Sequence, residues 1–355
     1  MVHTEKDKKD TKKPALKLFG RLNGLSIWTI LVIALVLLFV FSFVMGRYPI
    51  SPADVIKVLI SKVIPIEHTW SSTIETVVMQ IRLPRILAAI IVGACLALSG
   101  VSFQGLFRNP LVSPDILGVS SGAGFGAALA ILLSGNQLAI QVSAFCFALL
   151  AVGISYSISK MVKGNPTLSL ILAGMAIASL FGALLSLVKY VADPVNQLPA
   201  ITYWLMGSFA SVGYKSLLYA AIPMLIGITI LILIRWRFNV LAMGEDEAKA
   251  LGVDTGRLRV IIVVCCTMIT ASAVCISGTI GWVGLVIPHI GRALVGPDHK
   301  KLLPVCLLIG AIFLLLIDDI ARVVANVEIP IGILTAIVGI PFFVFLLKKG
   351  GRGWA

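Results

Sequence analysis

Apolar segments long enough, or nearly long enough, to cross a lipid bilayer recur along almost the whole chain and constrain its fold more than any other feature. A spanning helix needs about 20 consecutive, mostly apolar residues. About ten such segments occur, at residues 25–45, 85–106, 116–134, 138–159, 168–190, 214–234, 260–278, 280–295, 302–321 and 330–347. Because a chain in lipid must satisfy its backbone hydrogen bonds internally, we expect an all-α integral membrane protein with about ten transmembrane helices.

The composition supports this class. Of the 355 residues, 59% are hydrophobic and only 13% are charged, which is too apolar for a soluble core to hide. A net charge of +13 would suit a nucleic-acid partner if it formed a basic face on a soluble domain, but the charge lies in the loops, so we expect no such partner. The six cysteines lie in apolar runs without a CxxC pair or a cluster with histidine, so we interpret them as buried thiols and expect no metal site.

The distribution of Lys and Arg gives the orientation. If the N-terminus is cytoplasmic, ten spans place 21 of the 29 Lys and Arg residues on the inside and 8 on the outside. Cytoplasmic loops carry such an excess, so both termini are expected to be cytoplasmic. Residues 1–24 then form a polar, Lys-rich cytoplasmic tail, which we expect to be retained because no cleavage pattern ends the following apolar run, and residues 25–350 form the membrane domain.

Two further segments outside the spans are expected to be helices that lie at the outer membrane surface. The first, at about 52–64, begins with Ser51 as N-cap, Pro52 at the first helical position and an early acid, Asp54, and it mixes lysines with apolar residues. The second is 198–210, between the fifth and sixth spans.

Two patterns concern the packing of the spans. The eighth apolar segment, 280–295, is short and contains Pro288, so we expect a broken or re-entrant helix shielded by protein. Gly118, Gly122 and Gly126 recur four residues apart, which predicts a helix face that a neighbouring helix can approach closely.

No motif for catalysis is found. The chain lacks the GxxxxGK[ST] phosphate loop, HExxH and a defensible Ser-His-Asp set, so we do not expect an enzyme or an ATPase. Charge within the spans is almost absent, whereas carriers coupled to an ion gradient need midplane charges or broken-helix cation sites. The exceptions, Asp318 and Asp319, lie with Arg322 toward the outer end of the ninth span, where the i,i+4 spacing of Asp318 and Arg322 predicts an intrahelical ion pair. A self-sufficient secondary transporter of a small solute and a membrane enzyme or assembly factor remain the alternatives.

The inner loop 236–259 is unexpectedly acidic for the cytoplasmic side. Its segment GEDEAKALG has acids in a first helical turn and a glycine at its end, which predicts a short helix. Asp254 then predicts the cap of a second short helix through Arg257. This loop is a candidate docking surface, and a solvated loop is the alternative.

Arginines stand out on the opposite side. Arg82 and Arg85 flank Leu-Pro at the mouth of the second span, and Arg322 lies at the end of the ninth. Positive charge outside runs against the insertion bias, and arginine pairs well with carboxylates, so we infer an anionic partner at the outer face. Snorkelling of these side chains to lipid headgroups is the alternative.

Longer motifs carry a family resemblance from about residue 46 onward. They are Arg82-Leu-Pro-Arg85 with GACLALSG, RNPLVSPDILG at 108–118, TYWLMGS, GEDEAKALGV, SGTIGWVGLVIPHIGRALVGPDHKKLLP, DDIAR at 318–322, and EIPIG followed by GIPFFVFLL. In these motifs the chain resembles the permease subunits of ABC importers for iron-siderophores, haem and cobalamin, known as FecCD-type or cobalamin-importer-like permeases.

The resemblance implies a type II ABC importer permease in the cytoplasmic (inner) membrane of a prokaryote. Two permease copies, a homodimer or a pair of close paralogues, would enclose the pathway, with two ABC ATPase subunits below and an extracytoplasmic substrate-binding protein above. Such an assembly would import an iron chelate (siderophore or haem) or cobalamin by alternating access. ATP and Mg would be used by the ATPase, and no cofactor is expected on this chain.

The resemblance also implies roles for single residues. Short helices at about 241–258 would insert into the ATPase, which assigns the coupling role to Gly244, Glu245, Asp246, Glu247, Ala248, Leu251, Gly252, Asp254 and Arg257. Arg82, Arg85 and Arg322 would receive acidic residues from the two lobes of the binding protein. The gate and pathway are assigned to Gln104, Asn109, Asn165, Pro166, Thr167 and Leu168.

Overall fold

The structure is a computed structural model that describes residues 24–350 except 63, 66 and 163. The predicted tail at 1–24 therefore lies outside the described residues but for its last one. Each of the ten predicted apolar segments contains a helix. These helices are α2 (Gly24–Ser42), α5 (Leu83–Phe107), α6 (Val119–Leu133), α7 (Gln137–Met161), α8 (Pro166–Val191), α10 (Tyr214–Leu233), α13 (Thr255–Ser277), α14 (Val283–Val295), α15 (His299–Val323) and α16 (Ile331–Gly350). The described part of the chain contains no strand, so the fold is all-α as expected.

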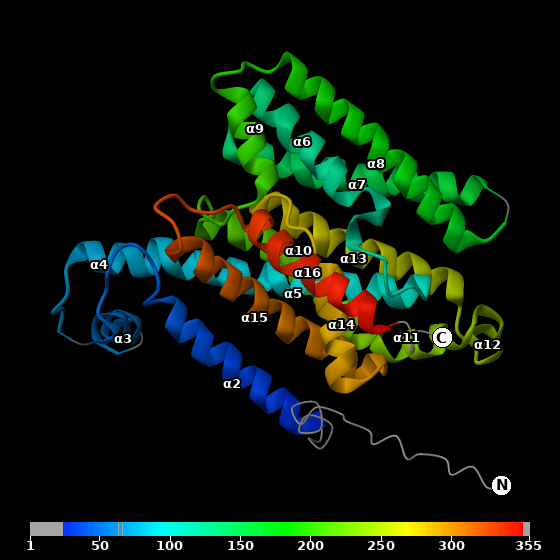
Figure 1. The fold of residues 1–355 in the computed structure, drawn as a ribbon, viewed down its shortest axis with the longest axis horizontal. Helices are drawn as coiled ribbons and strands as arrows, with labels where there is room; N and C mark the ends of the chain where they lie inside the picture. The colour runs from blue at the N-terminus through cyan, green and yellow to red at the C-terminus, as the bar shows by residue number, and fades with distance from the viewer. Residues whose placement is uncertain (1–23, 63, 66, 163, 351–355) are drawn as a thin grey trace, which may run out of the picture.

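The helices differ in length. Six continuous helical segments are long and apolar enough to cross a membrane: Ser72–Phe107, Gln137–Met161, Pro166–Val191, Tyr214–Leu233, Thr255–Ser277 and His299–Val323. Four apolar helices are shorter: Ser26–Ser42, Val119–Leu133, Val283–Val295 and Ile331–Phe345. Most helices run in roughly the same direction in Figure 1, with α3 and α4 at one end and α11, α12 and the end of α16 at the other.

Helix α5 is the centre of the bundle. Its residues are buried almost throughout, whereas most residues of α7, α8 and α10 are only partly buried or are exposed. Glycines let α5 approach its neighbours closely: a Cβ atom at Gly93 would lie 2.2 Å from the Gly310 carbonyl oxygen of α15, and one at Gly100 would lie 2.0 Å from the Gly284 oxygen of α14. Because lipid provides no hydrophobic drive between helices, this close contact helps to hold α5, α14 and α15 together.

The predicted glycine face is divided between two contacts. Cβ atoms at Gly122 and Gly126 would meet backbone oxygens of α7, which confirms a closely packed face. Gly118 instead precedes α6 and adopts φ +84° at the end of the 3-10 turn η2 (Pro114–Leu117), next to Ala178 of α8. The chain thus turns within the bundle before α6 begins, which the spacing of four did not predict.

The eighth span differs from the expectation at its proline. Helix α14 runs continuously through Pro288, and the non-helical stretch precedes it, at 278–282. That stretch ends at Trp282, which adopts φ +71°, an unusual value for a residue with a side chain. The interruption therefore lies between α13 and α14 and not within the helix.

Short helices lie at both ends of the bundle. At one end, α3 (Pro52–Ser61) is capped by the Ser51 side chain as expected, and α4 (Ser72–Thr76) and the π-helix η1 (Val77–Arg82) continue into α5. Helix α9 (Gln197–Met206) covers the first part of the second predicted surface segment. That these helices lie at the membrane surface stays a prediction.

The opposite end carries α11 (Arg235–Met243) and α12 (Glu245–Ala250). Helix α12 is the predicted short helix. The second predicted short helix is wrong as a separate element: Asp254 does accept a hydrogen bond from the Arg257 N–H, but the helix it caps is α13, which continues to Ser277.

Candidate functional site

The outer arginine cluster, Arg82, Arg85 and Arg322, lies inside the bundle. The three residues are only 4–5% exposed, so their side chains do not form an exposed basic surface. Arg85 of α5 binds Asp318 of α15 through two nitrogens, with Nε at 3.0 Å and Nη2 at 2.9 Å from Oδ1. Its Nη1 donates to Glu328 Oε1 at 2.8 Å. A forked pair of this kind is among the strongest polar contacts in proteins.

Arg322 completes the cluster on the α15 side. Its Nε lies 3.1 Å from Asp318 Oδ2, which confirms the predicted intrahelical pair, and its Nη2 contacts Asp319. Asp319 also accepts a hydrogen bond of 2.6 Å from the Ser42 hydroxyl of α2. The cluster therefore connects the outer ends of α2, α5 and α15.

Arg82 is bound differently. Its guanidinium donates to the backbone oxygens of Phe43 and Tyr48, the latter at 2.6 Å, and it has no carboxylate partner among the described residues. The three arginines and the carboxylates of Asp318, Asp319 and Glu328 carry equal and opposite formal charge. A docking role stays a prediction, and a partner carboxylate would have to compete with these internal ones.

The acidic turn at the other end is only partly free. Glu245 pairs with Arg259 of α13, whereas Asp246 and Glu247 are exposed. Ala248 is fully buried and anchors α12, and Leu251 is 61% exposed. Gly244 begins the turn at φ +136°, where a Cβ would collide with the Glu247 carboxylate. The exposed surface thus includes two acids and one leucine, alongside Lys249, and its docking to an ATPase stays a prediction.

The predicted gate residues fall into two separate places. Asn165 caps α8, with its Oδ1 accepting from the Thr167 N–H at 2.9 Å and the Leu168 N–H at 3.3 Å, and Leu168 is exposed. Pro166 takes the first helical position. None of these four residues borders the cavity that Gln104 and Asn109 line, so the structure does not bring the predicted set together.

Gln104 and Asn109 organise the turn after α5. Gln104 is buried and donates to the oxygens of Val112 and Gly284 at 3.2 and 3.4 Å. Asn109 Oδ1 accepts from the Leu111 N–H at 2.9 Å. Arg292 of α14 donates to Gln104 Oε1 at 2.6 Å, a contact between residues far apart in the sequence that sequence reasoning missed.

A larger cavity, of about 600 Å³, lies between the end of α9, the 279–282 stretch and α16. Its lining is mainly apolar and includes Met206, Trp282 and Ile337. Asp115 also borders it, with its carboxylate accepting a hydrogen bond from the Ser120 hydroxyl. Sequence analysis did not select these residues, because their proximity depends on the turn of the chain at η2.

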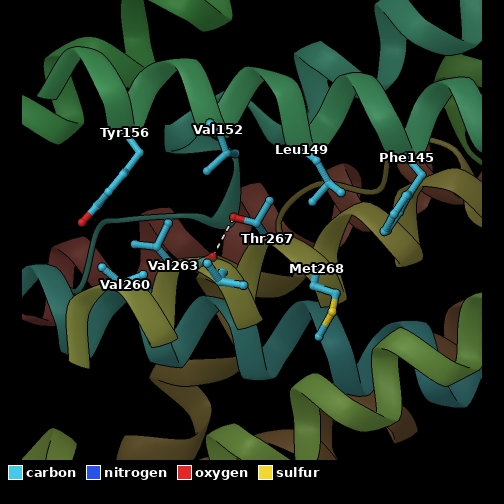
Figure 2. A pocket seen from close by; sticks show the side chains of 10 residues that line it. Phe145, Leu149, Val152, Tyr156, Val260, Val263, Thr267 and Met268 are labelled. Atoms are coloured by element: carbon cyan, nitrogen blue, oxygen red, sulfur yellow. Dashed lines mark hydrogen bonds between the residues drawn. The ribbon is translucent and has the colours of Figure 1, made fainter. Parts of the chain in front are cut away.

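A third hollow, about 280 Å³ in volume, separates α7 from α13 on the outside of the bundle. Figure 2 shows Phe145, Leu149 and Val152 facing α13 across it. The Thr267 hydroxyl is used internally, since it donates to the Val263 oxygen at 2.7 Å. The groove suits an apolar filling such as a lipid tail and offers little chemistry.

The cysteines do not form a site. Five of the six are buried, as interpreted from the sequence, but Cys146 of α7 is exposed, because α7 lies on the outside of the bundle. Within the described residues, no group of three His, Cys, Asp or Glu side chains is placed to hold a metal ion.

Comparisons with known proteins agree with this architecture. The profile of the FecCD transport family matches residues 30–349. The chain is 44% identical over 324 residues to the molybdate import system permease protein MolB of Haemophilus influenzae, covering 90% of this chain and 96% of the relative. It is 41% identical over 285 residues to the cobalamin import system permease protein BtuC of Halobacterium salinarum, covering 80% and 76%. Among solved structures, a metal-chelate type ABC transporter in an inward-facing conformation superposes with a TM-score of 0.81 at 43% identity, covering 90% of this chain and 97% of that one.

Proposed function

Because the chain belongs to the FecCD transport family and is the permease of an ABC importer, we propose that it moves an iron chelate (siderophore or haem) or cobalamin from an extracytoplasmic binding protein to the cytoplasm by alternating access. The observation that carries this proposal is the match over nearly the whole chain to a metal-chelate type transporter. We place the chain in the inner membrane of a prokaryote.

The large cavity supports a role as pathway. A volume of about 600 Å³ with a mostly apolar lining gives a bulky cargo few strong contacts. A pore need not hold its cargo tightly, because tight binding would slow release, and recognition can be left to the binding protein. The cavity borders Ile333, Ile337 and Ile340 of α16, which are exposed in the single chain and which a second permease copy would cover.

Energy is proposed to arrive from a separate pair of ATPase subunits that use ATP and Mg, with no cofactor on this chain. The exposed acids Asp246 and Glu247, with Leu251 beside them, offer a small surface for that contact. The outer arginine cluster is the proposed contact for the binding protein, through exchange of its internal carboxylates for those of the partner.

The alternative of a self-sufficient secondary transporter requires an ionisable group free to bind a coupling ion. The carboxylates Asp318 and Asp319 are instead engaged by arginines at the outer end of the bundle, and Asp115 at the large cavity accepts a hydrogen bond from the Ser120 hydroxyl. This pairing favours the ATP-driven mechanism.

Reconstitution tests the mechanism. The chain alone in liposomes should accumulate no cargo under a proton or sodium gradient, and addition of its ATPase and binding protein should give uptake that depends on ATP. Gradient-driven accumulation by the chain alone would refute the proposal.

Molybdate is a second candidate cargo, favoured by the 44% identity to MolB over 96% of that relative. Uptake of a radiolabelled ferric siderophore, haem, cobalamin and molybdate by the reconstituted importer distinguishes the two. We expect uptake of an iron chelate or of cobalamin, and uptake of molybdate alone would favour the second candidate.

A further inference from the structure

The cavity that Gln104 and Asn109 line has a volume of about 470 Å³ and lies at the end of the bundle that carries α11 and α12. Its polar lining consists of Gln104, Arg108, Asn109, His289, Arg292 and His299, and we call it the inner basic pocket. None of the residues that line it is acidic. The pocket therefore gathers two charged guanidinium groups and two imidazole rings, with no carboxylate in its lining.

Arg292 is fixed in place but incompletely bound. Its Nη2 donates to Gln104 Oε1 at 2.6 Å, and Gln104 is itself held by the oxygens of Val112 and Gly284. Arg292 Nη1 is buried and has no hydrogen-bond partner among the described residues. A buried guanidinium without a negative partner is costly, so this arrangement calls for an acceptor from outside the chain.

His299 is also fixed in place, by Asn239 of α11. Asn239 Oδ1 accepts from the His299 backbone N–H at 2.8 Å and lies 3.0 Å from Nδ1, so Nδ1 carries the proton. With the proton on Nδ1, His299 Nε2 is a hydrogen-bond acceptor; it is buried and has no partner in the described part of the chain, so it can accept from a hydroxyl group of a ligand but offers an oxyanion no donor. A Cβ at position 105 would lie 2.8 Å from this nitrogen, so Gly105 is needed to leave room for the ring.

Asp298, the residue before His299, already accepts hydrogen bonds from other groups of this chain. Asp298 accepts from the Asn239 amide at 2.6 Å and from the Lys300 N–H at 2.9 Å. These bonds, the Asn239 bond first, hold the pKa of Asp298 below its usual range, so it is ionised at neutral pH and occupied as the N-cap of α15. It does not line the pocket.

Arg108 lies at the solvent-exposed edge of the inner basic pocket. It ends α5 in the left-handed conformation, with φ +49°, and forms no ion pair within the described residues. This conformation is unusual for arginine and turns the chain so that positions 108 to 110 border the cavity.

We propose that the inner basic pocket binds an oxyanion of the phosphate class, either free phosphate or the phosphate of an anionic lipid headgroup. Guanidinium forks match the oxygens of such groups, and two arginines favour a multiply charged oxyanion over a single carboxylate. Ala242 of α11 also lines the pocket, which places the bound oxyanion beside the helix that leads into α12. All of the residues that would bind the oxyanion belong to this chain, and the pocket can bind it whichever cargo is transported.

The test uses the full chain in nanodiscs of phosphatidylcholine, titrated with inorganic phosphate in an isothermal calorimeter. Saturable binding is expected, and Arg292→Gln should weaken it at least about tenfold, because charge-assisted hydrogen bonds are lost. Arg108→Gln, at an exposed position that should not disturb folding, is expected to weaken it several-fold. Arg257→Gln is the matched control, since this arginine has an 87% exposed side chain and does not line the pocket.

A second experiment distinguishes free phosphate from a lipid headgroup as the bound ligand. If the lipid headgroup is the ligand, phosphatidylglycerol should co-purify with the wild type, be lost in Arg108→Gln, and compete with added phosphate. Absence of both saturable phosphate binding and arginine-dependent phosphatidylglycerol retention would overturn the proposal. Equal weakening by Arg257→Gln would also overturn it, because it would indicate binding to general positive charge.

Discussion

At the scale of single residues, the main finding is that charge inside the bundle is shared. Asp318 is fully buried and serves two arginines at once, Arg85 from α5 and Arg322 from its own helix. Each arginine has one further carboxylate contact, Glu328 for Arg85 and Asp319 for Arg322, but only Asp318 contacts both arginines.

Removing the Asp318 charge should therefore destabilise the protein strongly. Asp318→Asn leaves two buried guanidinium groups partly unpaired, and breaking a buried pair costs about 3–5 kcal/mol. Unfolding by SDS titration of the purified chain measures this change in the free energy of unfolding. Glu328→Gln is the control, expected to cost less than about 1 kcal/mol because Glu328 is partly exposed; equal losses would contradict the shared role of Asp318.

Close backbone contact is the second feature at this scale. Gly93→Ala places a methyl group against the Gly310 carbonyl oxygen and should cost about 1–3 kcal/mol, because two packed helices must separate. Gly153→Ala, where a Cβ meets open space, should be neutral or slightly stabilising. The same SDS titration compares them, and a neutral Gly93→Ala would show that α5 and α15 can move apart freely.

At the scale of elements, sequence patterns predicted what depends on neighbours along the chain. The apolar runs, the cap at Ser51 and the short helix at 245–250 were all predicted correctly, because each is specified by adjacent residues. The second short helix was wrong because Asp254 marks where a helix begins but gives no information on where it ends.

Contacts between residues far apart in the chain could not be predicted from the sequence. The pairing of Asp318 with Arg322 follows from a spacing of four, whereas that of Arg85 with Asp318 joins residues 233 positions apart. The contact of Gln104 with Arg292 is of the same kind. The residue types of the candidate sites were therefore recognisable, but their partners, and the burial of the arginines, required the fold.

Helix α12 is the element expected to act in coupling. Reversing its acids, with Glu245, Asp246 and Glu247 changed to Lys, should lower ATPase-coupled uptake at least about tenfold while the chain still inserts in the membrane, because a charge-complementary contact becomes repulsive. Uptake by the reconstituted importer is the measurement, and Lys249→Gln is the control within the same helix. Unchanged uptake would show that α12 is a solvated helix without a docking role.

At the scale of the whole molecule, binding of a partner at the outer end is expected to be an exchange of ion pairs. Glu328→Gln removes an internal competitor for Arg85, so it should strengthen docking of the binding protein several-fold, with an effect that decreases at high salt. Biolayer interferometry at two salt concentrations measures the affinity. Weaker docking, or an increase that salt does not change, would argue that Arg85 is only a structural residue.

Helix α5 has a mechanical consequence for the molecule. It carries Arg85 near one end and Gln104 near the other, with Arg82 and Arg108 flanking it, and glycines along its length allow close contact with α14 and α15. Those three helices are expected to move together as one rigid body. Any rearrangement that opens a route to one side of the membrane must then come from movement of the less buried helices, such as α7, α8 and α10, relative to that rigid body.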